Sequence, residues 1–196
     1  LNSAITGINR KKKAEEKYGC NIPWAILMDP TSACNLHCTG CWAAEYGNKL
    51  NLSYEELASV VRQGRDLGVY FYMFTGGEPL VRKKDVIRLC KEFNDCQFLA
   101  FTNGTLVDQT FCDEMKQVGN LMLAISLEGD PEVNDLRRGQ GVYAKVMHAM
   151  GLLKENGLIF GTSTCYTSKN CMSVTSPEFV KLMVDKGCRY AMYFHY

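Results

Sequence analysis

The chain has 196 residues, of which 46% are hydrophobic and 22% charged, and its formal net charge is +1. These values are typical of a globular domain with a sizeable core. The near-neutral charge argues neither for a nucleic-acid partner nor for a membrane surface, and we expect neither. No apolar stretch approaches the roughly 20 residues of a membrane-spanning helix, and Leu1 opens a polar segment rather than a secretory signal, so we expect a cytoplasmic location, reduced cysteines and no membrane partner.

The first predicted element is a polar helix over residues 8–18, which ends at Gly19. We assign residues 1–20 to this N-terminal helical segment and residues 21–196 to a core domain. The helix is expected to lie over either the mouth or the base of that domain, and the sequence favours neither position.

The core domain contains a repeating pattern of strands and helices. Strand-length apolar runs occur at residues 25–29, 69–74, 97–101, 121–127, 158–164 and 190–195. Amphipathic segments with helix start and stop signals separate these runs, and the clearest begins at Ser53, where Glu56 completes a capping box. These signals predict helices from Ser53 to Gly68, from Asp108 to Gly119, from Val142 to Asn156 and from Ser176 to Gly187.

Such alternation requires crossover connections and therefore a parallel sheet. We predict an α/β fold, a partial (β/α)₆ TIM-like barrel with parallel strands, whose functional loops follow the carboxyl ends of the strands. The chain does not begin with Met and has no helix after its sixth strand, so we expect a core barrel that is truncated at its C-terminus.

Cys34, Cys38 and Cys41 directly follow the first predicted strand. Three thiolates are one ligand short of a closed four-cysteine site, and their spacing on a short loop suits the irons of a cubane cluster. The alternative is a non-catalytic structural or interaction module that binds zinc, with His37 as a fourth ligand, or an iron-sulfur centre. The remaining cysteines carry no predicted chemistry; Cys90, Cys112 and Cys165 fit core positions, and Cys20, Cys96, Cys171 and Cys188 have no assigned role.

The segment Gly76-Gly77-Glu78-Pro79 follows the second predicted strand. The two glycines are expected to let a ligand approach the backbone, Glu78 offers an acceptor for an ammonium group, and Pro79 fixes the turn. The alternative is a plain turn from strand to helix. Because it lies beside the cysteine loop, the segment is a candidate binding site for the amino group of a zwitterion.

These two segments resemble the hallmark motifs of the radical S-adenosylmethionine (SAM) superfamily, Cys-x₃-Cys-x₂-Cys and Gly-Gly-Glu-Pro. The segments 102–104, 125–129 and 134–139 are similar to the branch that includes anaerobic sulfatase maturases and molybdenum cofactor protein A. The resemblance implies a [4Fe-4S] cluster on Cys34, Cys38 and Cys41, with SAM on the fourth iron. The implied SAM-binding residues are Gly76, Gly77, Glu78, Pro79, Thr102, Asn103, Ser126 and Arg138, with Arg137 as an adjacent candidate that is more simply a surface residue paired with Asp130, Glu132 or Asp135.

The resemblance further implies a 5′-deoxyadenosyl radical that abstracts hydrogen from a peptide or small-molecule substrate, in peptide or cofactor maturation, with a low-potential donor such as flavodoxin or ferredoxin. The sequence departs from the family pattern at Gly40, where an aromatic residue is common, and at Glu128, where Asp is usual. Several aromatic or polar residues are candidates for the walls of the barrel mouth, although residues at strand spacing more often belong to the core. They are Tyr70, Tyr72, Phe74, Tyr166, Tyr190, Tyr193 and His195.

Overall fold

The computed structural model describes residues 5–43, 47 and 49–195. The strands are β1 (Ile26–Met28), β2 (Phe71–Phe74), β3 (Gln97–Thr102), β4 (Leu121–Ser126), β5 (Phe160–Tyr166) and β6 (Ala191–His195). The helices are α1 (Thr6–Tyr18), α2 (Tyr54–Asp66), the 3₁₀ helix η2 (Pro79–Arg82), α3 (Lys83–Glu92), α4 (Gln109–Val118), α5 (Pro131–Arg138), α6 (Val142–Glu155), α7 (Cys171–Val174) and α8 (Pro177–Lys186).

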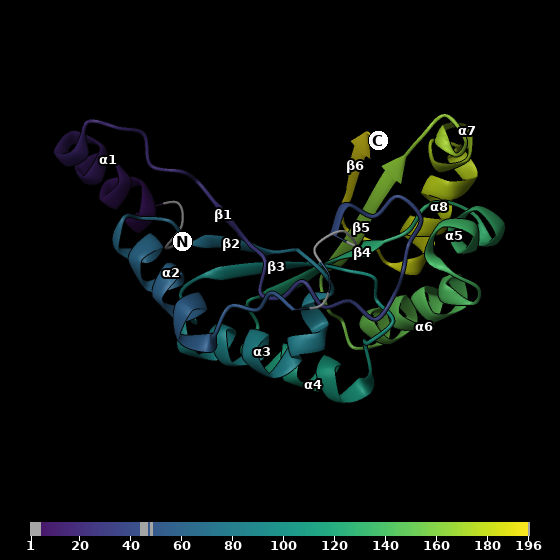
Figure 1. The fold of residues 1–196 in the computed structure, drawn as a ribbon, viewed down its shortest axis with the longest axis horizontal. Helices are drawn as coiled ribbons and strands as arrows, with labels where there is room; N and C mark the ends of the chain where they lie inside the picture. Colours follow the sequence, from purple (N-terminus) through teal and green to yellow (C-terminus); the bar gives the residue numbers. More distant parts are fainter. Residues whose placement is uncertain (1–4, 44–46, 48, 196) are drawn as a thin grey trace.

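The strands form one parallel sheet in the order of the sequence, from β1 to β6. The sheet curls, with α2, α3, α4, α6 and α8 along its outer side and its inner side open, as Figure 1 shows. Each crossover places a helix on the same face because parallel connections are right-handed. The predicted α/β partial barrel is confirmed.

The core lies between the sheet and the outer helices. In this layer the rings of Tyr72 and Phe74 stack on Phe98 at centroid distances of 5.7 and 5.5 Å, and all three side chains are completely buried. The Tyr72 hydroxyl donates to the carbonyl oxygens of Val61 and Val69. Tyr72 and Phe74 are therefore core residues, which is the alternative that their strand spacing favoured, and they do not line the mouth, since alternate strand residues point to opposite faces and these two point to the helices.

The concave face of the sheet carries the other set of strand residues. Leu27, Met73, Leu99 and Met122 occupy one row across β1 to β4, as the strand register shows. Phe101 and Phe194 approach each other across the curl, with ring centroids 6.0 Å apart although β3 and β6 are not neighbours. The inner wall is thus largely apolar.

Helix α1 lies at the base of the half-barrel rather than at its mouth. It packs on the turn before β2, where a Cβ on Gly68 would lie 2.5 Å from the carbonyl oxygen of Gly7. Arg10 donates to the carbonyl oxygen of Arg65 at 3.1 Å and lies over the Tyr70 ring. The predicted polar helix is confirmed, and α1 stands at the N-terminal end of β1 (Figure 1). None of the helices in the described part of the chain is long and apolar enough to cross a membrane.

Asp108 caps α4 as its sequence position predicts. Its carboxylate accepts from the Phe111 N–H at 2.8 Å and pairs with Lys83 Nζ at 2.6 Å, and this lysine contact lowers the pKa of the carboxyl. Asp108→Ala is expected to reduce the free energy of unfolding by about 1 kcal/mol. The lowered folded-state pKa means that the ionised carboxylate stabilises the fold above the unfolded pKa of roughly 4, so the charge-dependent part of this difference should be lost as the pH falls through the folded-state pKa.

Urea unfolding of both chains across that pH range measures the effect. Asp108→Asn is the matched control, because it keeps an oxygen that can cap the helix and removes the charge. A difference that persists unchanged at low pH would contradict the assigned ion pair.

Candidate functional site

The four segments that follow β1 to β4 meet at one edge of the sheet, as the sequence predicts for the carboxyl ends of parallel strands. The Glu78 N–H donates to the carbonyl oxygen of Ala33 at 2.8 Å, which joins the second segment to the cysteine loop. The Asn103 side-chain amide donates to Asn35 Oδ1 at 2.8 Å, which joins the third segment to the cysteine loop. The fourth segment leads into α5, whose Arg138 reaches Cys38.

The two glycines of the Gly-Gly-Glu-Pro segment lie directly against the backbone that leads into the cysteine loop. A Cβ on Gly77 would meet the Ala33 carbonyl oxygen at 2.2 Å, and one on Gly76 would meet that of Thr31 at 2.7 Å. The Gly77 N–H donates to the Thr31 carbonyl oxygen at 2.9 Å. The absent side chains therefore allow two loops to pack together, which is a different reason from the ligand approach that the sequence suggested.

Glu78 is almost completely buried and its carboxylate is held by the protein. It accepts from Thr102 Oγ1 at 2.7 Å, from the Asn103 N–H at 2.7 Å and from the Leu80 N–H at 3.0 Å, the last as the cap of η2, which begins at Pro79. Burial raises the pKa of Glu78, against the effect of these hydrogen bonds. Three donors leave little of the carboxylate for an ammonium group, so in this structure Glu78 primarily fixes the loop after β3.

Asn103 connects this buried carboxylate to the cysteine loop. Its side-chain oxygen accepts from the Thr105 N–H at 2.9 Å, and its amide nitrogen contacts Asn35 Oδ1 and lies 4.0 Å from Cys34 Sγ. Asn35 in turn donates to Thr105 Oγ1 at 2.8 Å. Thr102 and Asn103 are thus bonded to Glu78 and to the cysteine loop, and a direct SAM contact from either residue stays a prediction.

The cysteine loop turns tightly between Cys38 and Cys41. The Cys41 N–H donates to the Cys38 carbonyl oxygen at 3.2 Å, and Gly40 between them has a φ of 68°. Side chains other than glycine rarely adopt that angle, so an aromatic residue at position 40 would strain the turn. The departure from the family pattern at Gly40 therefore has a backbone reason, and Trp42 beyond it is 55% exposed.

Two of the three sulfurs have hydrogen-bond donors around them. The Leu36 N–H lies 3.4 Å from Cys34 Sγ, and Arg138 Nη1 lies 4.0 Å from Cys38 Sγ. Burial raises the pKa of the Cys34 and Cys38 thiols, and the Arg138 guanidinium counteracts this rise at Cys38. Donors that point at sulfur suit thiolate ligands of a soft metal such as iron, so the donor set fits an iron-sulfur cluster.

The loop is anchored at both ends, but its sulfurs are not drawn together. The Thr39 N–H donates to the Arg137 carbonyl oxygen at 2.8 Å, which fixes the far end of the loop to α5. Among the described residues, no three Cys, His, Asp or Glu side chains are already gathered closely enough to hold a metal ion. The assignment of Cys34, Cys38 and Cys41 therefore depends on the chemistry of the donors and stays a prediction.

Arg137 and Arg138 are the last two residues of α5, and both face Glu128. Arg138 Nη2 is hydrogen bonded to Glu128 Oε1, and Arg137 Nε lies 3.7 Å from the same oxygen. The ion pair of Arg137 in the described part of the chain is therefore with Glu128 and not with the expected Asp130, Glu132 or Asp135. The Asp135 carboxylate instead accepts from the Gly141 and Tyr143 N–H groups. Ser126 is the last residue of β4 and is half-buried.

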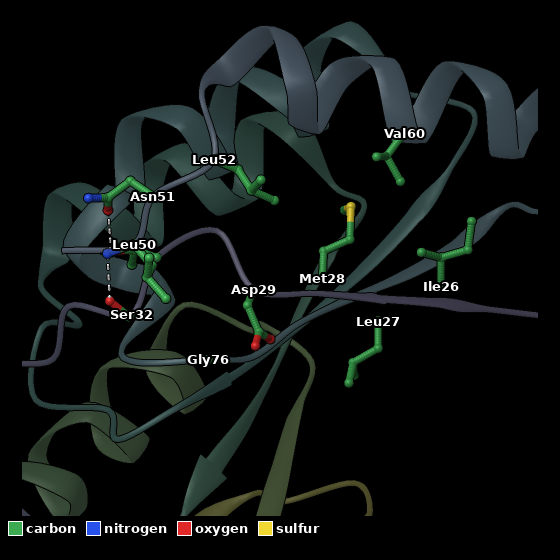
Figure 2. A pocket seen from close by; sticks show the side chains of 11 residues that line it. Ile26, Leu27, Met28, Asp29, Ser32, Leu50, Asn51, Leu52, Val60 and Gly76 are labelled. Atoms are coloured by element: carbon green, nitrogen blue, oxygen red, sulfur yellow. Dashed lines mark hydrogen bonds between the residues drawn. The ribbon is translucent and has the colours of Figure 1, made fainter. Parts of the chain in front are cut away.

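A cavity lies next to this site rather than around the cysteines. It has a volume of about 700 Å³ and is lined by Ile26, Leu27, Met28, Asp29, Thr31, Ser32, Leu50, Asn51, Leu52, Val60 and Gly76. In Figure 2, Ile26 and Met28 point toward Val60 on α2, whereas Leu27 and Asp29 point to the other side of β1. Asp29 lies next to Gly76, and burial raises the pKa of its carboxyl.

Comparison with known proteins identifies the family. The model of the radical SAM superfamily matches residues 28–169, which include the cysteine loop, the Gly-Gly-Glu-Pro segment and Arg138. The chain belongs to the radical SAM superfamily. This match covers most of the chain and confirms the resemblance drawn from the motifs.

Named relatives of this radical SAM chain include two enzymes. The Fe-coproporphyrin III synthase of Methanosarcina barkeri is 28% identical over 177 residues, 87% of this chain and 43% of that protein. The GTP 3′,8-cyclase of Petrotoga mobilis is 28% identical over 180 residues, 87% of this chain and 55% of that protein. The chain spans about half the length of such curated relatives.

Solved structures share the fold. Streptococcus suis SuiB bound to S-adenosylmethionine superimposes with a TM-score of 0.81 at 18% identity, over 97% of this chain and 45% of SuiB. Native anSMEcpe with bound AdoMet gives a TM-score of 0.72 at 23% identity, over 88% of this chain and 51% of that protein. These matches support the half-barrel architecture.

Sequence reasoning missed the residues that hold the loops in place. The buried amides of Asn134 and Asn170 bind the backbone of Glu128, and Asn35 contacts Asn103. Asn35 stands between Cys34 and Cys38, so its position was a usable signal. Asn170 lies 42 residues from Glu128, and nothing local in the sequence marks that contact.

Proposed function

We propose that this chain is the core of a radical SAM enzyme, in which Cys34, Cys38 and Cys41 hold a [4Fe-4S] cluster. The observation that carries the proposal is the position of the cysteine loop at the edge where four loops meet, with hydrogen-bond donors beside the sulfurs of Cys34 and Cys38. When bound, the cluster and SAM supply a 5′-deoxyadenosyl radical that abstracts hydrogen from a substrate.

The residues around the loop have positioning roles in this proposal. Gly76 and Gly77 keep the Gly-Gly-Glu-Pro segment in contact with the cysteine loop, and Glu78 orders Thr102 and Asn103 beside Cys34. Ser126 ends β4 at the same rim, and Arg138 lies next to Cys38, where a SAM carboxylate is expected to find a planar set of donors. The cofactor performs the difficult chemistry, and the protein positions it and excludes water.

The substrate is proposed to enter the concave face of the half-barrel. That face presents partly exposed apolar side chains such as Met73, Phe101 and Met122, which suit an apolar part of a peptide or of a cofactor precursor. SuiB has been solved with its precursor peptide SuiA, and relatives include synthases of tetrapyrroles, which supports maturation of a peptide or a cofactor. The electron would come from a donor such as flavodoxin or ferredoxin, which can reach the exposed residues Asn35, His37 and Thr39.

Anaerobic reconstitution with iron and sulfide, followed by dithionite and SAM, tests the proposal. We expect iron and acid-labile sulfide in equal amounts and the formation of 5′-deoxyadenosine and methionine, measured by mass spectrometry. Zinc without sulfide would support the structural module instead. A complete cluster that yields no 5′-deoxyadenosine would contradict the enzymatic role.

A further inference from the structure

The side chain of Arg138 lies between a cysteine sulfur and a buried carboxylate. Its Nη1 is 4.0 Å from Cys38 Sγ, and its Nη2 is hydrogen bonded to Glu128 Oε1. The Arg138 side chain is 12% exposed and that of Glu128 is fully buried. The positive charge beside Cys38 is therefore only weakly screened by solvent.

Glu128 is fixed from several directions, so it can hold Arg138 in one place. Its Oε2 accepts from the Cys165 N–H at 2.9 Å. Its backbone N–H donates to Asn134 Oδ1 at 3.2 Å, and its carbonyl oxygen accepts from Asn170 Nδ2 at 2.9 Å. The carboxylate is thus attached to β5, and the backbone of Glu128 is attached to α5 and to the loop before α7.

We propose that Glu128 positions Arg138 against the Cys38 sulfur and that this pair sets the reduction potential of the cluster. The inference rests on the proposed function, because it needs a cluster bound at Cys38. Hydrogen bonds to ligand sulfurs and nearby charges control the potential of iron-sulfur clusters. A cation at Cys38 stabilises the reduced, more negative cluster, whereas the buried Glu128 carboxylate opposes it.

This role differs from the SAM contact that the family resemblance implies for Arg138. A residue that only binds the SAM carboxylate changes the affinity for SAM but leaves the potential of the SAM-free cluster unaltered. A residue that acts on the sulfur changes the potential without SAM. The two roles are separated by measuring both quantities.

The experiment is a redox titration of the reconstituted protein without SAM, followed by electron paramagnetic resonance. Arg138→Gln is expected to lower the midpoint potential. Glu128→Gln is expected to raise it, because Gln keeps an oxygen that can accept from Arg138 and removes only the negative charge. Each shift should change the reduction equilibrium about tenfold, which is ~59 mV for one electron. Arg138→Lys should lie nearer to the wild type. The charge-matched surface controls Arg62→Gln and Asp185→Asn, whose side chains are half exposed, should shift the potential much less.

The outcomes separate this inference from the proposed function. A wild-type chain that assembles no cluster overturns the proposed function. A normal cluster whose potential is the same in Arg138→Gln as in the surface controls overturns the inference, as does a shift seen only with SAM present. If Glu128→Gln fails to assemble a cluster, the comparison of Arg138→Gln with Arg138→Lys decides alone, and equal potentials reject the role of the charge.

Discussion

Cys38→Ala is expected to abolish both the absorption of the iron-sulfur cluster and the formation of 5′-deoxyadenosine. A cluster with three protein ligands has no spare thiolate, and Cys38 is also the sulfur next to Arg138. The readouts are iron and sulfide content, visible absorption after anaerobic reconstitution, and 5′-deoxyadenosine after reduction with SAM. We expect all of them to fall to background.

Cys20→Ala is the matched control for this variant. Cys20 is an exposed cysteine that follows α1 at the base of the half-barrel, away from the loop rim. It should keep its full iron content and its 5′-deoxyadenosine formation. Retention of either signal in Cys38→Ala would show that the cluster ligands are misassigned.

Gly77→Ala should reduce the amount of bound cluster although it replaces no cysteine. The new Cβ would lie 2.2 Å from the Ala33 carbonyl oxygen and 2.6 Å from that of Ser32, and both are backbone atoms that cannot move independently. Overpacking of this kind reduces the free energy of unfolding by about 1–3 kcal/mol. The same displacement separates the cysteine loop from the rim, so we expect iron content after reconstitution to fall severalfold.

Gly151→Ala in α6 provides the control for that substitution. A Cβ at Gly151 meets no atom within 4 Å, and alanine in a helix is more stable than glycine by about 0.5–1 kcal/mol. This variant should unfold at a higher urea concentration with unchanged iron content. Normal iron and stability in Gly77→Ala would mean that the contact between the two loops is unimportant.

Features of the fold that depend on neighbouring residues were predictable from the sequence. The Ser53 capping box and the Asp108 cap begin α2 and α4 as expected, because each cap bonds a backbone N–H three residues ahead. The strands fall within the predicted apolar runs or a residue or two beyond them. Four helices in the described part of the chain had no prediction, namely η2, α3, α5 and α7. Helix α3 continues directly from η2 without a side-chain cap, and α5 has a usable signal in Asp130 and Pro131 that was not applied.

The interactions that organise the site were not predictable, because they join residues distant in the chain. Glu78 was expected to face a ligand, yet it accepts from Thr102 and Asn103, which lie 24 and 25 residues away. The motif revealed that a carboxylate is needed at this position, but its partners depend on how β2 and β3 pair. Likewise, the sequence marked Arg138 as a charged residue near the rim, and its distance from Cys38 depends on the placement of α5.

The attachment of the cysteine loop to α5 has a consequence for the order in which the protein matures. The Thr39 N–H bonds to the Arg137 carbonyl oxygen, and Arg138 reaches Cys38 across a separation of 100 residues. During synthesis the three thiols therefore leave the ribosome well before the segment that anchors them has been translated. Metal delivery is expected to follow translation of this later segment, so iron-trafficking factors would meet a nearly folded chain rather than a nascent one.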